Sequence, residues 1–292
     1  MRISPRVPLT RAAFVNLTCT WSPRAFCVHA ILFLIAFLLA PTLGWAQQTL
    51  EDQALEQQGL APAGAGWTGT VGAGLEVSPT YPGANTDRTH PVPLVSIDHG
   101  SRLFIGPLGI GIAAVRWNGF RAGPVLGFER GRYASDDPRL AGLGDISTGI
   151  TAGVFAGYSR GPLAISATAR QAISHSTNGL SALLQVDWRR AFPGVRTLVT
   201  AGPDLEFGDG NYERTWFGIS PEQSTTSGLP EYAPRGGINR VGLHAAVTHR
   251  ASQHLVLRFF AGLSDIIGDA AQSPIVERRT RISVGAGIAY HF

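Results

Sequence analysis

The last twelve residues, Arg281-Ile-Ser-Val-Gly-Ala-Gly-Ile-Ala-Tyr-His-Phe292, alternate between two kinds of side chain. Every second residue from Ile282 to Tyr290 is apolar, and the residues between them are polar or small. Successive side chains of a β-strand point to opposite faces, so this segment predicts a strand with one apolar face. A terminal strand that ends on an aromatic residue is typical of bacterial outer-membrane barrels, where Tyr290 and Phe292 would form the assembly signal. A last strand in a soluble β-sandwich is the alternative.

Residues 1–46 are predicted to be a secretory signal peptide. Four arginines and no acidic residue precede an apolar run at residues 30–40 (AILFLIAFLLA), and Pro41, Gly44 and Ala46 follow it. Small residues at these last two positions predict cleavage after Ala46. An uncleaved membrane anchor is the alternative, but a helix that crosses a bilayer needs about 20 residues.

Removal of this segment changes the composition of the chain. It contains both cysteines, Cys19 and Cys27, so the mature chain would have no disulfide and no cysteine–metal site. Its four arginines account for the whole net charge of +4, and the sequence contains no lysine. The mature chain is therefore about neutral, without the basic patch that indicates nucleic acid. No His-x-His pair or carboxylate cluster indicates a metal, and no motif indicates a cofactor.

Residues 67–292 contain further segments that alternate as the last one does. The clearest lie at 67–77, 120–130, 146–158, 180–189, 195–207, 237–249 and 255–263. Strands in globular proteins usually have about five or six residues, whereas a tilted strand crosses a membrane with about 9–11. Only a closed barrel satisfies every backbone polar group in lipid. The sequence therefore predicts an all-β, antiparallel transmembrane barrel at 67–292, preceded by a flexible periplasmic leader at 47–66.

The connections between these segments alternate in length. Short turns are expected at 98–101, 117–119, 160–162, 192–194 and 250–252, and longer loops at 78–91, 131–144, 208–236 and 267–280. In outer-membrane barrels the short turns are periplasmic and the long loops are extracellular. The pattern predicts about twelve strands with both termini in the periplasm. This count takes residues 92–116 as three short strands split at Gly106-Pro107. If these residues form one long irregular strand, the barrel has ten strands.

Two sets of residues suggest what lines and surrounds the barrel. Arginines fall mostly on the inward-facing positions of the strands: Arg121, Arg170, Arg189, Arg196, Arg240, Arg258 and Arg281. We expect them to form a salt-bridge network with Glu76, Glu129, Asp187, Asp204 and Glu206, and a basic lumen that attracts anions is the alternative. Trp67, Tyr158, Trp188 and Tyr290 lie near strand ends, which is typical of the aromatic belt at lipid headgroups.

One loop segment, residues 211–219 (NYERTWFGI), combines aromatic and charged residues away from the lipid-facing positions. Recognition usually takes place on surface loops that a rigid scaffold holds. We therefore expect Tyr212, Arg214, Trp216 and Phe217 to form an exposed extracellular contact surface or a lid folded over the lumen.

Four short motifs give the chain its resemblance to a known family. They are residues 78–84 (SPTYPGA), 142–145 (GLGD), 227–232 (SGLPEY) and 268–276 (GDAAQSPIV). Their order and spacing, with the terminal Tyr-His-Phe, resemble the MipA/OmpV family of Gram-negative outer-membrane proteins from about residue 67 to residue 292. The first motif departs from the acidic form expected of the family. The resemblance singles out Gly142, Gly144, Asp145, Gly268, Asp269, Ser273 and Pro274 as family-like loop residues.

The resemblance implies a non-enzymatic barrel in the cell outer membrane. Such a protein would contact outer-membrane lipid and the barrel assembly machinery, and would act as a scaffold for peptidoglycan (murein) synthesis and remodelling. Its implied partners are a lytic transglycosylase and a peptidoglycan synthase. A small-solute channel and a surface adhesin that acts through its loops are the alternatives. For an enzyme, the best candidate is Ser174-His175-Ser176, but no Gly-x-Ser-x-Gly nucleophile elbow is present.

Overall fold

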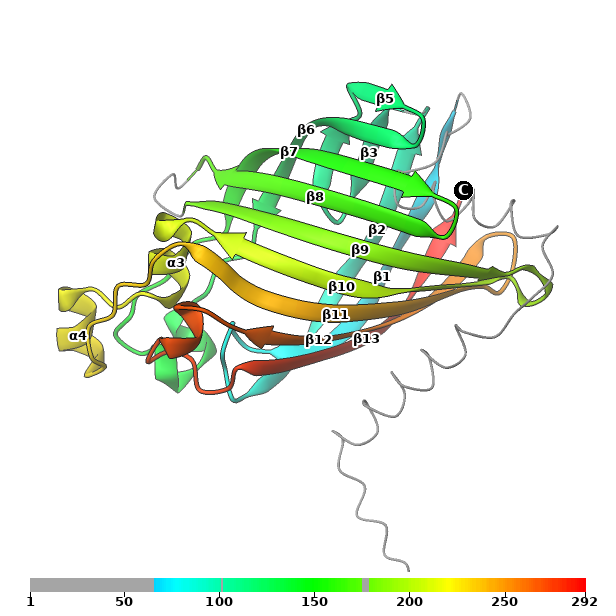
Figure 1. Cartoon of the computed structure of the whole chain (residues 1–292). Coiled ribbons are helices and arrows are strands. Elements are labelled where there is room, and N and C mark those ends of the chain that lie inside the picture. Colours follow the sequence, from blue (N-terminus) through cyan, green and yellow to red (C-terminus); the bar gives the residue numbers. More distant parts are fainter. Residues whose placement is uncertain (1–65, 101, 175–178) are drawn as a thin grey trace, which may run out of the picture. The chain divides into compact units, whose positions relative to one another are not determined.

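The computed structural model describes residues 66–292 except 101 and 175–178. The predicted signal peptide with its cleavage site after Ala46, and residues 47–65 of the predicted leader, lie outside the described residues. The alternating segments form a single sheet of antiparallel strands (Figure 1). These strands are β1 (Trp67–Pro79), β2 (Asp87–His99), β3 (Leu103–Gly106), β4 (Gly109–Ile112), β5 (Val115–Trp117), β6 (Phe120–Glu129), β7 (Gly149–Arg160), β8 (Leu163–Ala172), β9 (Leu180–Phe192), β10 (Thr197–Gly208), β11 (Gly237–Arg250), β12 (Leu255–Ile266) and β13 (Thr280–His291).

The sheet closes on itself. The first strand, β1, pairs with the last, β13, and β4 pairs with β6. Both β4 and β5 lie along β6, separated by Ala113 and Ala114, so together they form one interrupted wall strand. The barrel wall therefore has twelve strands, as predicted, and the ten-strand alternative is wrong. The predicted split at Gly106-Pro107 is confirmed, because β3 ends at Gly106 and β4 begins at Gly109.

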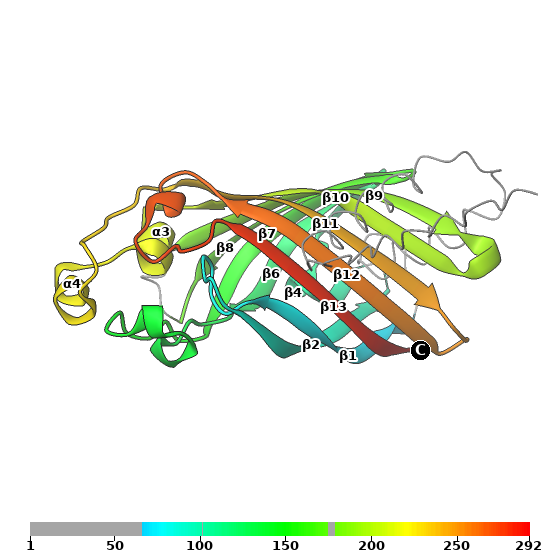
Figure 2. The same cartoon turned by 90° about the horizontal axis from the view of Figure 1, so that it is seen from below.

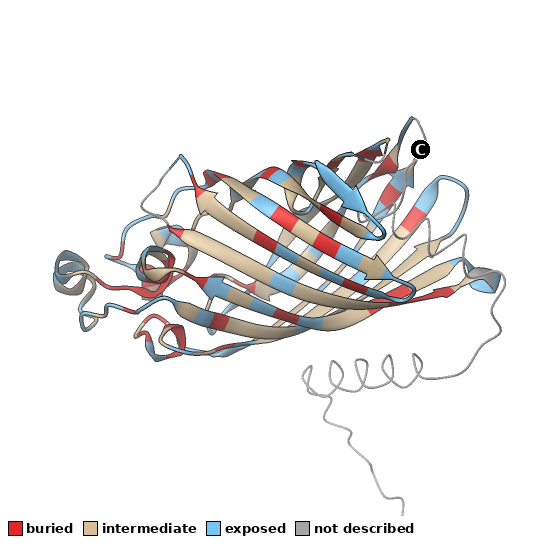
Figure 3. Cartoon of the chain, turned by 45° about the horizontal axis from the view of Figure 1, so that its top comes forward, coloured by how far each residue is buried: buried red, intermediate tan, exposed pale blue. Residues whose placement is uncertain are grey.

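Alternating side chains give the barrel two different surfaces. Exposed and less exposed residues alternate along the strands (Figure 3). Large apolar side chains face outward on most strands, including Val71, Leu75, Leu126, Phe128, Val154, Leu205, Leu243, Phe259, Val284 and Ile288. A soluble protein would bury these side chains, whereas a barrel in lipid presents them to hydrocarbon. Among the described residues, no helix has the length and apolar character needed to cross a membrane.

The two ends of the barrel differ in their connections (Figures 1 and 2). We call one the turn end; it carries the connections at 100–102, 118–119, 161–162, 193–196 and 251–254, together with Phe292. The other, the loop end, carries the connections at 80–86, 107–108, 130–148, 209–236 and 267–279, together with the end of β8 and the start of β9. The four long loops predicted from the sequence all lie at the loop end, whereas the connection at 107–108 is as short as a turn. The backbone of Phe292 exchanges hydrogen bonds with Gly69 at the turn end, so the C-terminus completes the wall beside β1.

The loop at 209–236 contains two helices that the sequence pattern did not predict. They are α3 (Gly210–Phe217) and α4 (Pro221–Ser227). Asp209 caps α3 by accepting a hydrogen bond from the Tyr212 amide at 2.8 Å. Ser220 and Gln223 form a capping box at the start of α4, where Pro221 occupies a first-turn position. Capping residues of this kind are sequence signals of helix starts. The alternating pattern that predicts strands does not contain them.

Candidate functional site

The long loops pack together over the mouth at the loop end, and we call residues 80–86, 130–148, 209–236 and 267–279 the cap. The cap has two apolar clusters of its own. The first consists of Tyr81, Ala84, Leu140, Leu143, Ile219 and Ile275, with Leu229 and Tyr232 packed against it. The second consists of Tyr212, Trp216, Phe217, Ile266, Ala270 and Ala271, with Ile146 and Val276 packed against it. Loops that bury apolar side chains against each other form a folded layer, in contrast to independent solvated loops.

The family-like residues of the 142–145 motif hold cap loops in contact. Gly142 has a φ of +79°, and a Cβ there would lie 2.7 Å from the Thr226 carbonyl group. The Thr226 hydroxyl donates a hydrogen bond to the Gly142 carbonyl at 2.6 Å. Gly144 also has a positive φ, +74°, and Asp145 Oδ1 accepts a hydrogen bond from the Ala134 amide at 2.7 Å. The motif therefore makes a tight turn that fits against α4.

The 268–276 motif makes the equivalent connections from the other side. The Asp269 carboxylate pairs with Arg235 at 3.2 Å, and its carbonyl accepts a hydrogen bond from the Tyr232 hydroxyl at 2.6 Å. Gly268 adopts a φ of +63° just before it. The buried Ser273 hydroxyl donates to the Phe217 carbonyl at 2.6 Å, and the Pro274 carbonyl accepts a hydrogen bond from Arg139. Residues that lie far apart in the sequence thus meet in one cap.

The expected exposed contact surface is wrong for three of its four residues. Tyr212, Trp216 and Phe217 are buried, with Trp216 only 8% exposed, and only Arg214 faces solvent. The helical turn of α3 places the three aromatic side chains on one face, and that face packs against the end of β12 and the 267–279 loop. Arg132, also buried, donates to the Trp216 carbonyl at 2.7 Å. The segment belongs to the interior of the cap.

Glu213 on α3 is a buried acid that the sequence did not single out. Its side chain is 1% exposed, and Asn239 on β11 donates a hydrogen bond to its Oε1 at 2.7 Å. Burial, opposed by that hydrogen bond and reinforced by Glu206, raises the pKa of Glu213 to about 7. The available signal was an acidic residue among aromatic residues at 212–217, because an acid in such surroundings is rarely buried unless a polar partner pairs with it.

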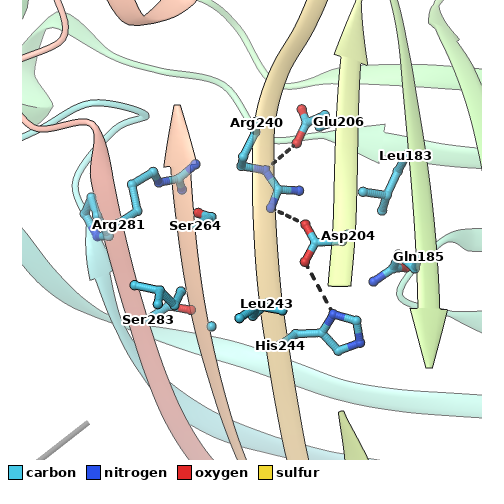
Figure 4. Close-up of a pocket in the computed structure, with 13 residues that line it drawn as sticks. Leu183, Gln185, Asp204, Glu206, Arg240, Leu243, His244, Ser264, Arg281 and Ser283 are labelled. Carbon is cyan, nitrogen blue, oxygen red and sulfur yellow. Dashed lines mark hydrogen bonds and ion pairs between the residues drawn. The ribbon is translucent and has the colours of Figure 1, made fainter. Parts of the chain in front are cut away.

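Beneath the cap, the inner faces of β9 to β13 form a polar half of the lumen (Figure 4). Arg240 pairs with Glu206 at 2.9 Å and with Asp204. His244 contacts Asp187 at 2.8 Å and Asp204 at 3.3 Å. A cavity of about 350 Å³ adjoins this network. It is lined by Pro79, Leu183, Gln185, Asp204, Glu206, Arg240, Leu243, His244, Gly262, Leu263, Ser264, Arg281 and Ser283.

The predicted salt-bridge network is therefore found only in part. Glu76 pairs with His90 at 3.5 Å instead of with an arginine, and Arg189 lies 3.9 Å from Asp187. Within the described residues, no ion pair forms on Arg121, Arg170, Arg258 or Arg281. Equal totals of arginines and acids did not ensure pairing, because the strand register fixes which side chains meet.

The opposite wall of the lumen carries an apolar cluster. Phe104, Ala113, Val125 and Phe155 form a buried cluster with Leu108 packed against it. The rings of Phe104 and Phe155 meet edge to face, with centroids 4.9 Å apart. A Cβ at Gly111 would lie 2.2 Å from the Phe104 ring, so glycine is needed for this packing. The small inward residues seen in the sequence thus leave room for aromatic rings on one side and a polar cavity on the other.

The turn end differs from the cap in charge. Its connections contain no Asp or Glu, while the cap loops contain Asp136, Asp137, Asp145, Asp209, Glu213, Glu222, Glu231, Asp269 and Glu277. Four arginines at this end are exposed: Arg102, Arg116, Arg160 and Arg196. Trp67, Tyr158 and Tyr290 are also exposed near it, as an aromatic belt requires. Phe292 lies beside them, and its role with Tyr290 as an assembly signal stays a prediction.

The enzyme candidate at 174–176 falls mostly outside the described residues, since only Ser174 is described. Its Oγ accepts a hydrogen bond from the Ile150 amide at 2.8 Å. Among the residues that the structure covers, no three His, Cys, Asp or Glu side chains gather as metal ligands.

Comparison with known proteins gives the family. Residues 71–292 match the family described as MltA-interacting protein MipA. No curated protein matches the chain. Solved structures to which the chain shows similarity include OprB of Pseudomonas putida, at 11% sequence identity and a TM-score of 0.37, over 69% of this chain and 59% of that chain. A second is OprG of Pseudomonas aeruginosa, at 8% sequence identity and a TM-score of 0.27, over 78% of this chain and 96% of that chain. A third is the toluene transporter TodX of Pseudomonas putida, at 12% sequence identity and a TM-score of 0.33, over 78% of this chain and 90% of that chain. The chain thus spans about three-fifths of OprB. From the family match and the closed barrel, we conclude that this chain is an outer-membrane β-barrel protein of the MipA family.

Proposed function

We propose that this barrel is a non-enzymatic interaction protein that docks peptidoglycan-remodelling enzymes at its turn end. The partners that the family suggests are a lytic transglycosylase and a peptidoglycan synthase. Short turns of outer-membrane barrels face the periplasm, where both enzymes act on the cell wall. The description of the family as MltA-interacting supports a protein partner.

The distribution of charge at the turn end is the observation that carries this proposal. Arg102, Arg116, Arg160 and Arg196 are exposed there, and no ion pair forms on any of them within the described part of the chain. With no acidic residue in the adjoining turns, this end presents a positive field. Such a surface accelerates and orients the approach of a partner with an acidic patch.

The turn end also offers apolar anchors for a protein interface. Trp117 is 76% exposed beside Arg116, and Val195 is 61% exposed beside Arg196. Tryptophan and arginine dominate the energetics of protein interfaces. Short turns on a closed barrel hold them in fixed positions, which limits the entropy lost on binding. The cap, by comparison, buries most of its aromatic side chains in its own clusters.

Charge reversal tests the proposal. The triple variant Arg102→Glu, Arg160→Glu, Arg196→Glu would be expressed in native outer membranes, and the transglycosylase that co-purifies with it would be quantified. We expect at least a tenfold loss of capture relative to the unmodified protein. The matched control reverses two exposed cap arginines, Arg214→Glu and Arg235→Glu, and should retain capture. Equal capture by the triple variant and the unmodified protein would overturn docking at the turn end.

A second candidate function, a small-solute channel, is favoured by the polar half of the lumen. The cavity of about 350 Å³ is lined by charged and hydroxyl side chains together with Pro79 and Leu183, and it lies between the cap and the turn end. Steady conductance of the purified full-length protein in a planar bilayer would support it. The channel would be ruled out if neither the full-length protein nor a variant without α3 and α4 conducts ions.

A further inference from the structure

We propose that the polar half of the lumen is a binding site for a small monocarboxylate, anchored by the guanidinium of Arg281. The ligand also carries a hydroxyl or amino group at the other end. This site is independent of what docks at the turn end, so the failure of either proposal leaves the other intact.

The anchoring residue lacks an acceptor of its own. Arg281 lies on β13, paired in register with Ser264 on β12, and it lines the cavity of about 350 Å³ (Figure 4). Its Nε is buried without a hydrogen-bond partner, and no carboxylate among the described residues forms an ion pair with it. A buried N–H donor without an acceptor is costly, and an oxyanion in the cavity would satisfy it.

In contrast to Arg281, the neighbouring Arg240 on the same wall has carboxylate acceptors for its guanidinium. It pairs with both Asp204 and Glu206, so those two carboxylates are already committed. Of the acids whose charge acts on Arg281, Glu206 is thus held by Arg240, and Glu76 pairs with His90. The positive charge on Arg281 is left for a species that enters the cavity.

The side chains around Arg281 suit a carboxylate. Ser264 and Ser283 line the same cavity and can donate hydroxyl hydrogen bonds to the second carboxylate oxygen. Gly262 keeps this place open, because a Cβ there would lie 2.9 Å from the Ser283 hydroxyl oxygen. The cavity volume falls at the low end of the range of about 300–1,000 Å³ for small-molecule sites.

Side chains on the far side of the cavity would bind the hydroxyl or amino group of the ligand. Gln185, Asp204 and His244 line this side, and the side-chain carbonyl of Gln185 can accept a hydrogen bond from a hydroxyl or ammonium group. A ligand with a carboxylate at one end and a donor at the other matches both walls. A simple fatty acid matches only the first.

Calorimetric titration of the full-length protein in detergent tests the site, with 4-hydroxybutanoate as the probe and its neutral analogue 4-hydroxybutanamide as the comparison. We expect 4-hydroxybutanoate to bind at least tenfold more tightly than the amide. Arg281→Gln should weaken 4-hydroxybutanoate binding at least tenfold, and Gly262→Val should abolish it by filling the cavity. The control Arg278→Gln removes a cap arginine that pairs with Asp87, and should bind as the unmodified protein does.

The comparison of 4-hydroxybutanoate with its amide uses the unmodified protein, so it decides the question even if Arg281→Gln does not fold. Equal binding of the two probes, or no binding of 4-hydroxybutanoate, would overturn the site. Unchanged 4-hydroxybutanoate affinity in a folded Arg281→Gln variant would also overturn it.

Discussion

Asn239 on β11 donates its side-chain amide to Oε1 of Glu213 on α3, at 2.7 Å, and so joins the cap to the barrel wall. The other carboxylate oxygen, Oε2, is buried and has no hydrogen-bond partner among the described residues. A buried carboxylate satisfied on only one oxygen is tolerated best when it is protonated. The attachment of the cap should therefore depend on pH.

The folded cap should be more stable at acidic pH than at alkaline pH. The pKa of Glu213 rises from an ordinary value of 4.5 to about 7 on folding. A raised carboxyl pKa favours the folded form fully below pH 4.5, and this advantage is lost as the pH rises through 7. The loss amounts to about 3 kcal/mol well above pH 7. Hydrogen exchange of the α3 amides at pH 5 and pH 8, corrected for intrinsic rates, measures it.

The variant Glu213→Gln should remove this pH dependence, because a neutral amide cannot ionise. The control Glu222→Gln alters an exposed acid on α4 and should keep the pH dependence. Cap protection that falls between pH 5 and pH 8 as steeply in Glu213→Gln as in the unmodified protein would assign the effect to another group.

Loss of the Ser273 hydroxyl should loosen α3 specifically. This hydroxyl donates to the Phe217 carbonyl at 2.6 Å, and both residues are buried. Ser273→Ala leaves the carbonyl without its donor, at a cost of about 1–3 kcal/mol. Limited proteolysis should then cleave the 209–236 loop faster. Thr225→Ala, which removes an exposed hydroxyl bonded within α4, should leave the cleavage rate unchanged.

Truncation of Trp216 should destabilise the cap, whereas truncation of Trp117 should not. Trp216 is 8% exposed in the cap, and Trp216→Ala should destabilise the cap by about 3–5 kcal/mol through the cavity it leaves. Trp117 is 76% exposed at the turn end, and Trp117→Ala should leave cap proteolysis unchanged. An equally resistant cap in both variants would mean that the second apolar cluster does not hold it.

A methyl group at Gly242 should break the lumen network. A Cβ there would lie 2.8 Å from both carboxylate oxygens of Asp204, which pairs with Arg240 and His244. Gly242→Ala should cost about 1–3 kcal/mol and lower the temperature at which the folded band disappears on an SDS gel. Gly237→Ala on the same strand has open space around its Cβ, so its transition should match that of the unmodified barrel.

The barrel could be predicted from the sequence because one constraint, the need to satisfy every backbone group in lipid, acts on every strand. Alternation in segments such as 281–292 therefore indicated both the strands and their outward faces. The strand count was reached from the turn and loop lengths alone. The short strands β3 to β5 were harder, since they hold 4, 4 and 3 residues and show little alternation.

The site was predicted less well, because its interactions join distant parts of the chain. The motifs at 142–145 and 268–276 were recognisable in sequence, but their convergence depends on loops folding onto one another. The buried state of Tyr212 and Trp216 follows from this tertiary packing, which a local pattern does not contain. The pairing of Arg240 in preference to Arg281 depends on strand register and tilt.

Photo-crosslinking in intact cells tests docking at the turn end most directly. A photo-reactive residue placed at Val195 or Ala251, both exposed at the turn end, would capture whatever binds there, and the same residue at Thr225 on α4 is the control. The account predicts that the turn-end positions capture a lytic transglycosylase or a peptidoglycan synthase and that Thr225 captures neither. Capture of these enzymes from Thr225, or of assembly factors alone from Val195 and Ala251, would contradict it.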